Sequence, residues 1–134
     1  MSNDVATTGA VRGAPLFLLR TEGAAMLTAA AIAYHATGAG WWVFAGLFLV
    51  PDLGMLGYLK GPVLGSALYN AAHTYVVPAA LLAGALWLGH PIAQAVALVW
   101  IAHIGFDRMV GYGLKYPVAF NATHLGRVGG QGRV

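Results

Sequence analysis

The chain has 134 residues, of which 59% are hydrophobic and only 8% are charged. Water-soluble domains carry about 25% charged residues, so this sequence has too little charge to cover a surface that faces water. The mean hydropathy of +0.71 indicates instead that lipid is the solvent for much of the chain. Because the sequence contains no Cys, disulfides, thiolate zinc sites, Cys nucleophiles and iron–sulfur clusters are excluded.

Four apolar windows are long enough to cross a bilayer, which takes about 20 residues for each helix. In chain order they are residues 16–37, 41–59, 62–88 and 91–114. Trp41 and Trp42 open the second window, as expected for an aromatic belt at the interface. Pro78 predicts a kink in the third, and Pro91 begins the fourth, where proline is tolerated. We therefore expect an all-α, polytopic membrane protein folded as an antiparallel four-transmembrane-helix bundle.

Around this transmembrane domain, residues 15–118, we expect a flexible N-terminal segment at 1–14 and a flexible basic tail at 119–134. A cleaved signal peptide is the alternative for the first window, but the start of the chain is long and only weakly basic. Every basic residue falls at a connection or helix end on one side of the bundle: Arg12, Arg20, Lys60, Arg108, Lys115, Arg127 and Arg133. This distribution predicts a multi-pass protein with both termini in the cytoplasm.

Polar residues in all four windows lie at a similar depth, about 10–16 Å from the predicted cytoplasmic helix ends. These residues are Glu22, Asp52, Asn70, His73, His103 and Asp107. Within the fourth window, His103 and Asp107 are four residues apart and share a helix face. A charge at membrane depth costs at least about 2.5–3.5 kcal/mol, so we expect these groups to face inward and to line one cavity together with Arg108.

Six ordered strings overlap this polar layer: LRTEG at 19–23, PDLGMLGY at 51–58, YNAAHTY at 69–75, HIGFDR at 103–108, GYGLKY at 111–116 and THLG at 123–126. Together they resemble the family called domain of unknown function 4260 (DUF4260), over nearly the whole chain after about residue 15. The resemblance implies a small four-helix integral membrane protein and supplies no reaction. Since the motif residues coincide with the polar layer, it favours a site over a scaffold.

The favoured hypothesis is a cofactor-free acid/base enzyme, a cyclase, isomerase or epoxide-opening enzyme, acting on a lipophilic small molecule. A carboxyl group in an apolar cavity can act as a general acid near neutral pH, while one paired with His or Arg remains a base. The predicted catalytic residues are Glu22, Asp52, His73, His103 and Asp107. The predicted substrate-binding residues are Arg20, Tyr58, Tyr69, Asn70, Arg108, Tyr112 and Lys115.

Three alternatives remain. A divalent metal such as zinc or iron could bind His73, His103, Asp107 and Asp52, although the Glu-x-x-His pairs of di-iron bundles are missing from the sequence. A proton-linked transporter would use the titratable layer, but the outer half of the bundle offers few polar residues. A structural polar network would use the same groups as interhelical glue.

The expected partners are the lipid bilayer and a lipophilic small molecule, and a homodimer is compatible with the small size. Nucleic acid is not an expected partner, because no basic face with interleaved aromatic residues is present in the sequence.

Overall fold

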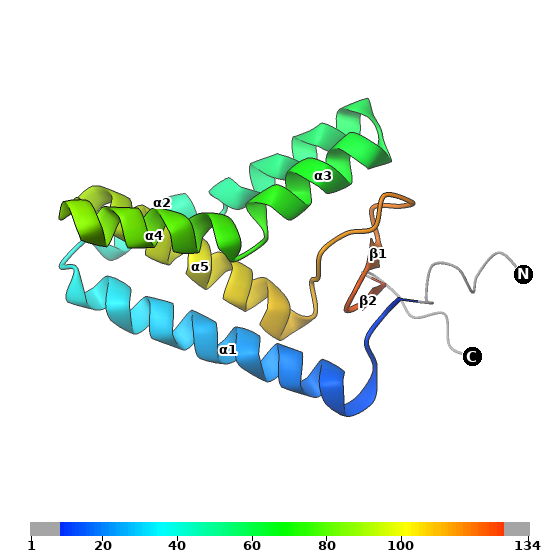
Figure 1. Cartoon of the computed structure of the whole chain (residues 1–134), viewed down its shortest axis with the longest axis horizontal. Coiled ribbons are helices and arrows are strands. Elements are labelled where there is room, and N and C mark those ends of the chain that lie inside the picture. The colour runs from blue at the N-terminus through cyan, green and yellow to red at the C-terminus, as the bar shows by residue number, and fades with distance from the viewer. Residues whose placement is uncertain (1–8, 128–134) are drawn as a thin grey trace, which may run out of the picture.

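The computed structural model describes residues 9–127, which form six helical segments and one short hairpin (Figure 1). The order is α1 (Gly13–Ala36), α2 (Trp41–Phe48), η1 (Val50–Lys60), α3 (Pro62–Ala72), α4 (Val76–Leu88), α5 (Pro91–Val110), β1 (Ala122–Thr123) and β2 (Gly126–Arg127). The fold is therefore almost entirely helical, as the sequence predicts. Helix ends follow local chemistry: Pro91 begins α5, and Gly111 ends it in the left-handed conformation at φ +99°.

Within residues 9–127, three helical stretches are long and apolar enough to cross a membrane: Gly13–Ala36, Trp41–Lys60 and Pro91–Val110. The predicted third span at 62–88 is instead two helices, α3 and α4, and each is shorter than the roughly 20 residues that a single span needs. The helix is interrupted at residues 73–75, just ahead of Pro78. Proline has no N–H to bond the carbonyl of residue 74 and its ring crowds that carbonyl, so the helix restarts with Pro78 in its first turn.

The predicted second span also changes course. It runs as α2 to Phe48 and continues from Val50 as η1, a 3₁₀ helix with Pro51 at its start. From this point η1 and α3, with the C-cap residue His73, form an arm, residues 50–73, in which the two helices pack against each other and diverge from the remaining helices (Figure 1). We call it the η1–α3 arm.

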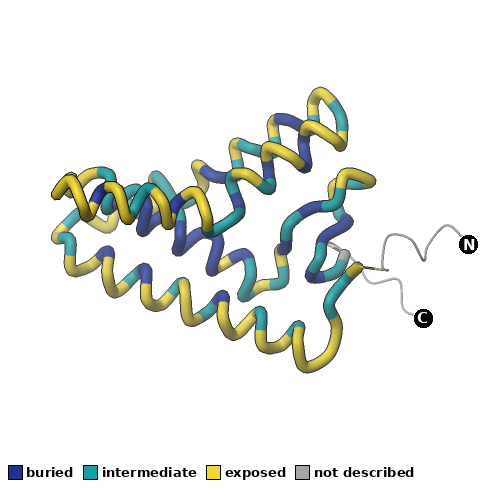
Figure 2. The backbone as a smooth tube through the Cα atoms, viewed as in Figure 1, coloured by how far each residue is buried: buried dark blue, intermediate teal, exposed yellow. Residues whose placement is uncertain are grey.

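The core of the molecule surrounds α5, which packs against α1, α4 and α2. Buried residues on α5 include Val99, Ala102 and Ile104, and Tyr34 of α1 is fully buried beside Val99. The outer faces of the helices remain exposed (Figure 2). They carry large apolar side chains such as Trp42, which is 91% exposed, and Trp87, which is 89% exposed. Such surfaces suit a lipid environment.

The chain after α5 folds back rather than forming the expected flexible tail over 119–127. Strands β1 and β2 pair in antiparallel register, with Ala122 opposite Arg127, and Ala122 is fully buried. The backbone N–H of Val11 donates to the His124 carbonyl at 2.8 Å, which ties the hairpin to the start of the chain. The remaining parts of the two predicted flexible segments, 1–8 and 128–134 with Arg133, lie outside the described residues.

Candidate metal centre

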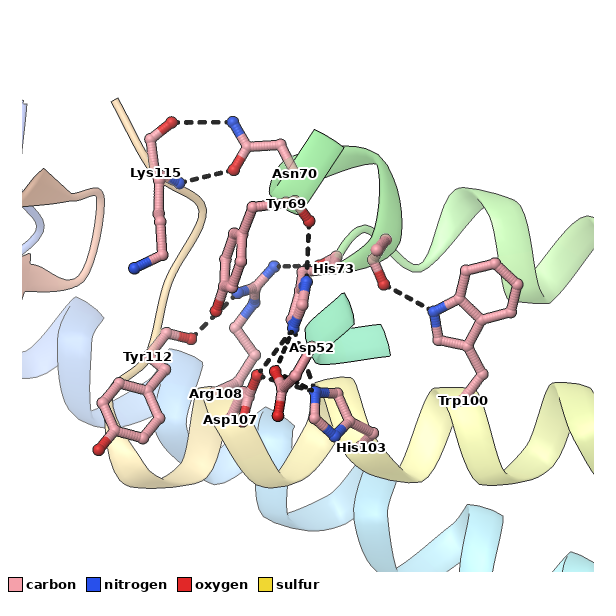
Figure 3. A network of polar contacts seen from close by, with 11 residues as sticks. Asp52, Tyr69, Asn70, His73, Trp100, His103, Asp107, Arg108, Tyr112 and Lys115 are labelled. Atoms are coloured by element: carbon pink, nitrogen blue, oxygen red, sulfur yellow. Dashed lines mark hydrogen bonds and ion pairs between the residues drawn. The ribbon is translucent and has the colours of Figure 1, made fainter. Parts of the chain in front are cut away.

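Four polar side chains meet where the η1–α3 arm touches α5 (Figure 3). Asp52 lies in the first turn of η1, and His73 is the residue that ends α3. His103 and Asp107 stand one turn apart on the same face of α5. The two interruptions in the predicted spans thus bring Asp52 and His73 to the helix that carries the other two residues.

Five of the six separations between the facing atoms of the cluster are nearly equal. The Nε2 atoms of His73 and His103 are 3.1 Å apart. The Asp52 Oδ1 atom is 3.2 Å from the first and 3.3 Å from the second, and the Asp107 Oδ2 atom is 3.4 Å and 3.3 Å from them. The two carboxylate oxygens complete a set in which all four atoms lie within 4.8 Å of one another.

The five imidazole–imidazole and imidazole–carboxylate separations, 3.1–3.4 Å, match edges of a small coordination tetrahedron, and the sixth, between the two carboxylate oxygens, is at most 4.8 Å. A regular tetrahedron with an edge of about 3.3 Å has its centre about 2.0 Å from each corner, which is the Zn–N and Zn–O bond length in proteins. The site therefore has the donor types, number and spacing to hold one zinc-sized ion.

Hydrogen bonding fixes the orientation of the His73 ring. Its Nδ1 lies 2.8 Å from the Tyr69 carbonyl, which can only accept, so Nδ1 carries a hydrogen. The neutral ring then turns the lone pair of Nε2 toward His103 Nε2 and the two carboxylates. A backbone carbonyl that sets the tautomer in this way is the usual outer partner of a metal-binding histidine. With ionised carboxylates, the centre needs a cation or a proton to offset the repulsion between these lone pairs.

Access to the cluster comes from one side. The side chain of His73 is 0% exposed, that of His103 is 2% and that of Asp107 is 9%, whereas the Asp52 side chain is 31% exposed. Three donors are thus enclosed in the protein, and Asp52 is the donor that solvent reaches.

Side chains from α5 satisfy the carbonyls that the break in the third span leaves without helical partners. Trp100 Nε1 donates to the Ala72 carbonyl at 2.6 Å, and Arg108 Nη2 donates to the His73 carbonyl at 2.9 Å. Arg108 Nη1 also donates to the Tyr112 carbonyl at 3.1 Å. Sequence reasoning missed Trp100, although its place three residues before His103 puts it on the same face of α5.

Aromatic rings enclose both histidines. Tyr69 stacks on His73 with ring centroids 3.7 Å apart, and Phe48 meets His103 edge-on at 5.2 Å. Lys115 lies behind Tyr69, with its Nζ 4.6 Å from the Tyr69 ring centroid and donating to the Phe120 carbonyl at 2.7 Å. Burial lowers the pKa of the Lys115 amine.

Two more predicted binding residues shape this side of the site. Asn70 joins the loop after α5 to α3, because it donates to the Lys115 carbonyl at 2.8 Å and accepts from the Lys115 N–H at 2.7 Å. Tyr58 packs edge-on against Phe120 at 5.1 Å.

The other predicted site residues lie apart from the cluster. Glu22 lines a separate cavity beside α1. Arg20 is exposed and its Nε donates to the Met109 carbonyl at 2.8 Å. The Tyr112 side chain is 42% exposed, and Figure 3 shows it pointing away from the histidines. Depth along a helix predicted these residues, but depth does not determine which way a side chain faces.

The fold and the site together define a helical protein with membrane-length apolar helices and a buried His/Asp cluster that could hold a metal ion. The chain belongs to the DUF4260 family, domain of unknown function, whose model matches residues 17–128. No curated protein and no solved structure matches it.

Proposed function

We propose that this protein is a multi-pass membrane metalloenzyme that holds one Zn²⁺ ion through Asp52, His73, His103 and Asp107. The observation that carries the proposal is the 3.1–3.4 Å spacing of the imidazole and carboxylate atoms. Zinc favours four-coordinate tetrahedral sites of N and O donors. The η1–α3 arm and α5 would each supply two ligands, one histidine and one carboxylate.

A catalytic role is supported by the unequal burial of the four donors. A fully enclosed set would indicate a structural ion, whereas a catalytic site keeps one position open to solvent or substrate. Because four protein ligands leave no open position, the Asp52 side chain, at 31% exposure, is the ligand that water or substrate would displace. When bound, zinc supplies an activated water and polarises a carbonyl or phosphoryl oxygen. Asp52 would move between binding the ion and accepting a proton, while the three enclosed residues keep their geometry.

The substrate side of the proposal rests on the surroundings. The apolar faces next to the site and the membrane-length helices favour a lipophilic substrate that reaches the Asp52 side from the bilayer. The positions of Lys and Arg in the sequence favour cytoplasmic termini and a site in the cytoplasmic half.

A second candidate is the cofactor-free acid/base enzyme. The two shortest separations, 3.1 Å between the imidazoles and 3.2 Å between His73 and Asp52, are also hydrogen-bond distances, so a proton held within the cluster would relieve the repulsion as well. In that case the Asp107–His103 pair would be the base and Asp52 the accessible acid.

Metal content separates the two candidates. We would purify the protein in detergent, measure zinc by elemental analysis and native mass spectrometry, and repeat this with His73→Gln and Asp107→Asn. Glu22→Gln is the control, since it changes a carboxylate outside the cluster. We expect one ion per chain in the wild type and the control, and loss in both cluster variants.

Co²⁺ loading provides an independent readout, because a tetrahedral site gives intense visible absorption. A folded wild type that takes up neither ion after dialysis would reject the metalloenzyme and favour the acid/base candidate. Equal metal content in all four proteins would show that the ion binds elsewhere.

A further inference from the structure

The cavity that Glu22 lines, of about 450 Å³, lies between α1, the start of α4, the end of α5 and the C-terminal hairpin. Its polar lining consists of Glu22, Arg108, His124 and Tyr75. Leu19 and Met26 lie on the same face of α1 as Glu22, because they are spaced three and four residues from it. A charged centre is thus flanked by apolar side chains within a volume typical of small-ligand sites.

The charged groups in this cavity have unused binding capacity. Within residues 9–127, neither Glu22 nor Arg108 forms an ion pair. Arg108 uses two N–H groups on the His73 and Tyr112 carbonyls and retains the others, since a guanidinium carries five donors.

Two neutral donors add to the polar wall. His124 Nδ1 accepts from the Leu114 N–H at 2.9 Å, so the neutral ring carries its hydrogen on Nε2, which is left to donate. The Tyr75 hydroxyl is buried without a hydrogen-bond partner in the described part of the chain. One carboxylate therefore shares the cavity with a guanidinium and two neutral donors.

We propose that this cavity binds the headgroup of a phospholipid that carries both a phosphate and a primary ammonium, as an ethanolamine phospholipid does. The phosphate fits Arg108 and the His124 N–H, which are the donors suited to phosphate oxygens. The ammonium fits the Glu22 carboxylate. An acyl chain can follow the α1 face past Met26, which is 38% exposed.

The charges favour this occupant over other lipids. An anionic headgroup without an amine would meet the Glu22 carboxylate, which has no ion-pair partner within residues 9–127, and a choline headgroup has no N–H to donate to it. A purely cationic ligand would be repelled by Arg108. The cavity shares none of the four metal-binding side chains, although Arg108 also donates to the His73 carbonyl, so the proposal does not depend on zinc binding.

The test is a lipid titration of the detergent-solubilised full-length chain, read by native mass spectrometry. The probes are an ethanolamine, a choline and a glycerol phospholipid with identical acyl chains, together with soluble glycerophosphoethanolamine. We expect the wild type to prefer the ethanolamine lipid. Glu22→Gln should weaken that lipid by about tenfold while leaving the glycerol lipid unchanged or tighter, because only the ammonium partner is removed.

Arg20→Gln is the matched control, since Arg20 lies on another face of α1, and it should keep the preference. Met26→Trp is a second variant that occupies the cavity without removing a charge, and it should weaken all three lipids. Equal binding of the three lipids by the wild type, or an unchanged preference in Glu22→Gln, would overturn the proposal. Glycerophosphoethanolamine binding as tightly as the lipid would overturn a membrane source for the ligand.

Discussion

Gly23 of α1 and Gly105 of α5 face each other where the two helices cross. A Cβ atom on Gly23 would lie 2.7 Å from the Gly105 carbonyl oxygen, and one on Gly105 would lie 2.8 Å from the Gly23 carbonyl oxygen. Backbone atoms cannot turn aside as a flexible side chain can. The absence of side chains here is what allows α1 to cover the helix that carries His103 and Asp107.

Replacing Gly105 by Ala should therefore destabilise the protein. The added methyl group forces α1 and α5 apart, and overpacking of this kind costs about 1–3 kcal/mol. Gly84→Ala on α4 is the control, because its Cβ would meet nothing within 4 Å and alanine favours a helix by roughly 0.5–1 kcal/mol. Thermal unfolding in detergent should show a lower Tm for Gly105→Ala and an equal or higher Tm for Gly84→Ala. Equal Tm values in the two variants would contradict the close crossing.

The Trp100 hydrogen bond should contribute to stability through the carbonyl that it satisfies. Trp100→Phe keeps an aromatic ring on α5 but leaves the half-buried Ala72 carbonyl unpaired, at a cost of about 1 kcal/mol. Trp87→Phe is the matched change at an indole that is 89% exposed, and it should have little effect. Chemical or thermal unfolding measures both. The interpretation fails if the two substitutions lower stability equally.

Acid should destabilise the C-terminal fold through His124. Burial, together with the nearby Arg108 charge, lowers the pKa of His124 in the folded protein, whereas the unfolded chain keeps a value near 6.5. Below that pH the unfolded state binds the proton that the folded state resists, so the free energy of unfolding decreases as pH falls from about 6.5 and recovers above it. Protonation also removes the acceptor for the Leu114 N–H.

The measurement is Tm against pH for the wild type, His124→Gln and His90→Gln. His90 is the matched control, because it is exposed and its Nδ1 also accepts a backbone N–H, from Ala93. We expect the acid-side slope to flatten in His124→Gln and to persist in His90→Gln. A slope that is identical in all three proteins would assign the acid sensitivity to other groups.

The two carboxylates of the metal centre should contribute unequally to metal affinity. Asp107 is enclosed, so water cannot take the place of the carboxylate that Asp107→Asn removes. This substitution should therefore lower the Zn²⁺ affinity by a factor of about 100 or more. Asp52 is partly exposed, so water can take its place in Asp52→Asn and the loss should be nearer tenfold. Competition with a chelator of known affinity gives both values. A larger loss for Asp52→Asn would reverse the assignment of the exchangeable position.

Much of the fold could be predicted from composition and spacing, since long apolar windows and an i,i+4 pair such as His103 and Asp107 are local properties. The interruption of the helix at 73–75 is harder to predict. Pro78 indicates that the helix is disturbed nearby, but it does not indicate that a new helix begins two residues before the proline. The hairpin at 122–127 has little local signal, and its burial comes from contacts across the chain such as that of Val11 with His124.

The candidate site could be predicted only in part, because its completeness depends on how the helices pack against one another. The separation of Glu22 from Asp52 depends on how α1 rotates against α5, and this rotation is set by the crossing of Gly23 and Gly105. No pattern within a single helix contains that information.

The division of the four donors between two structural units has a thermodynamic consequence. Asp52 and His73 belong to the η1–α3 arm, whose helices pack chiefly against each other, and His103 and Asp107 belong to α5. Consider a ligand that binds all four side chains. If contact between the arm and α5 raises the affinity for that ligand by some factor, then ligand binding favours the contact by the same factor. Ion binding and contact between the arm and α5 are therefore linked. Backbone hydrogen exchange in residues 50–73 should slow when the ion binds, which gives a readout of ion binding besides metal analysis.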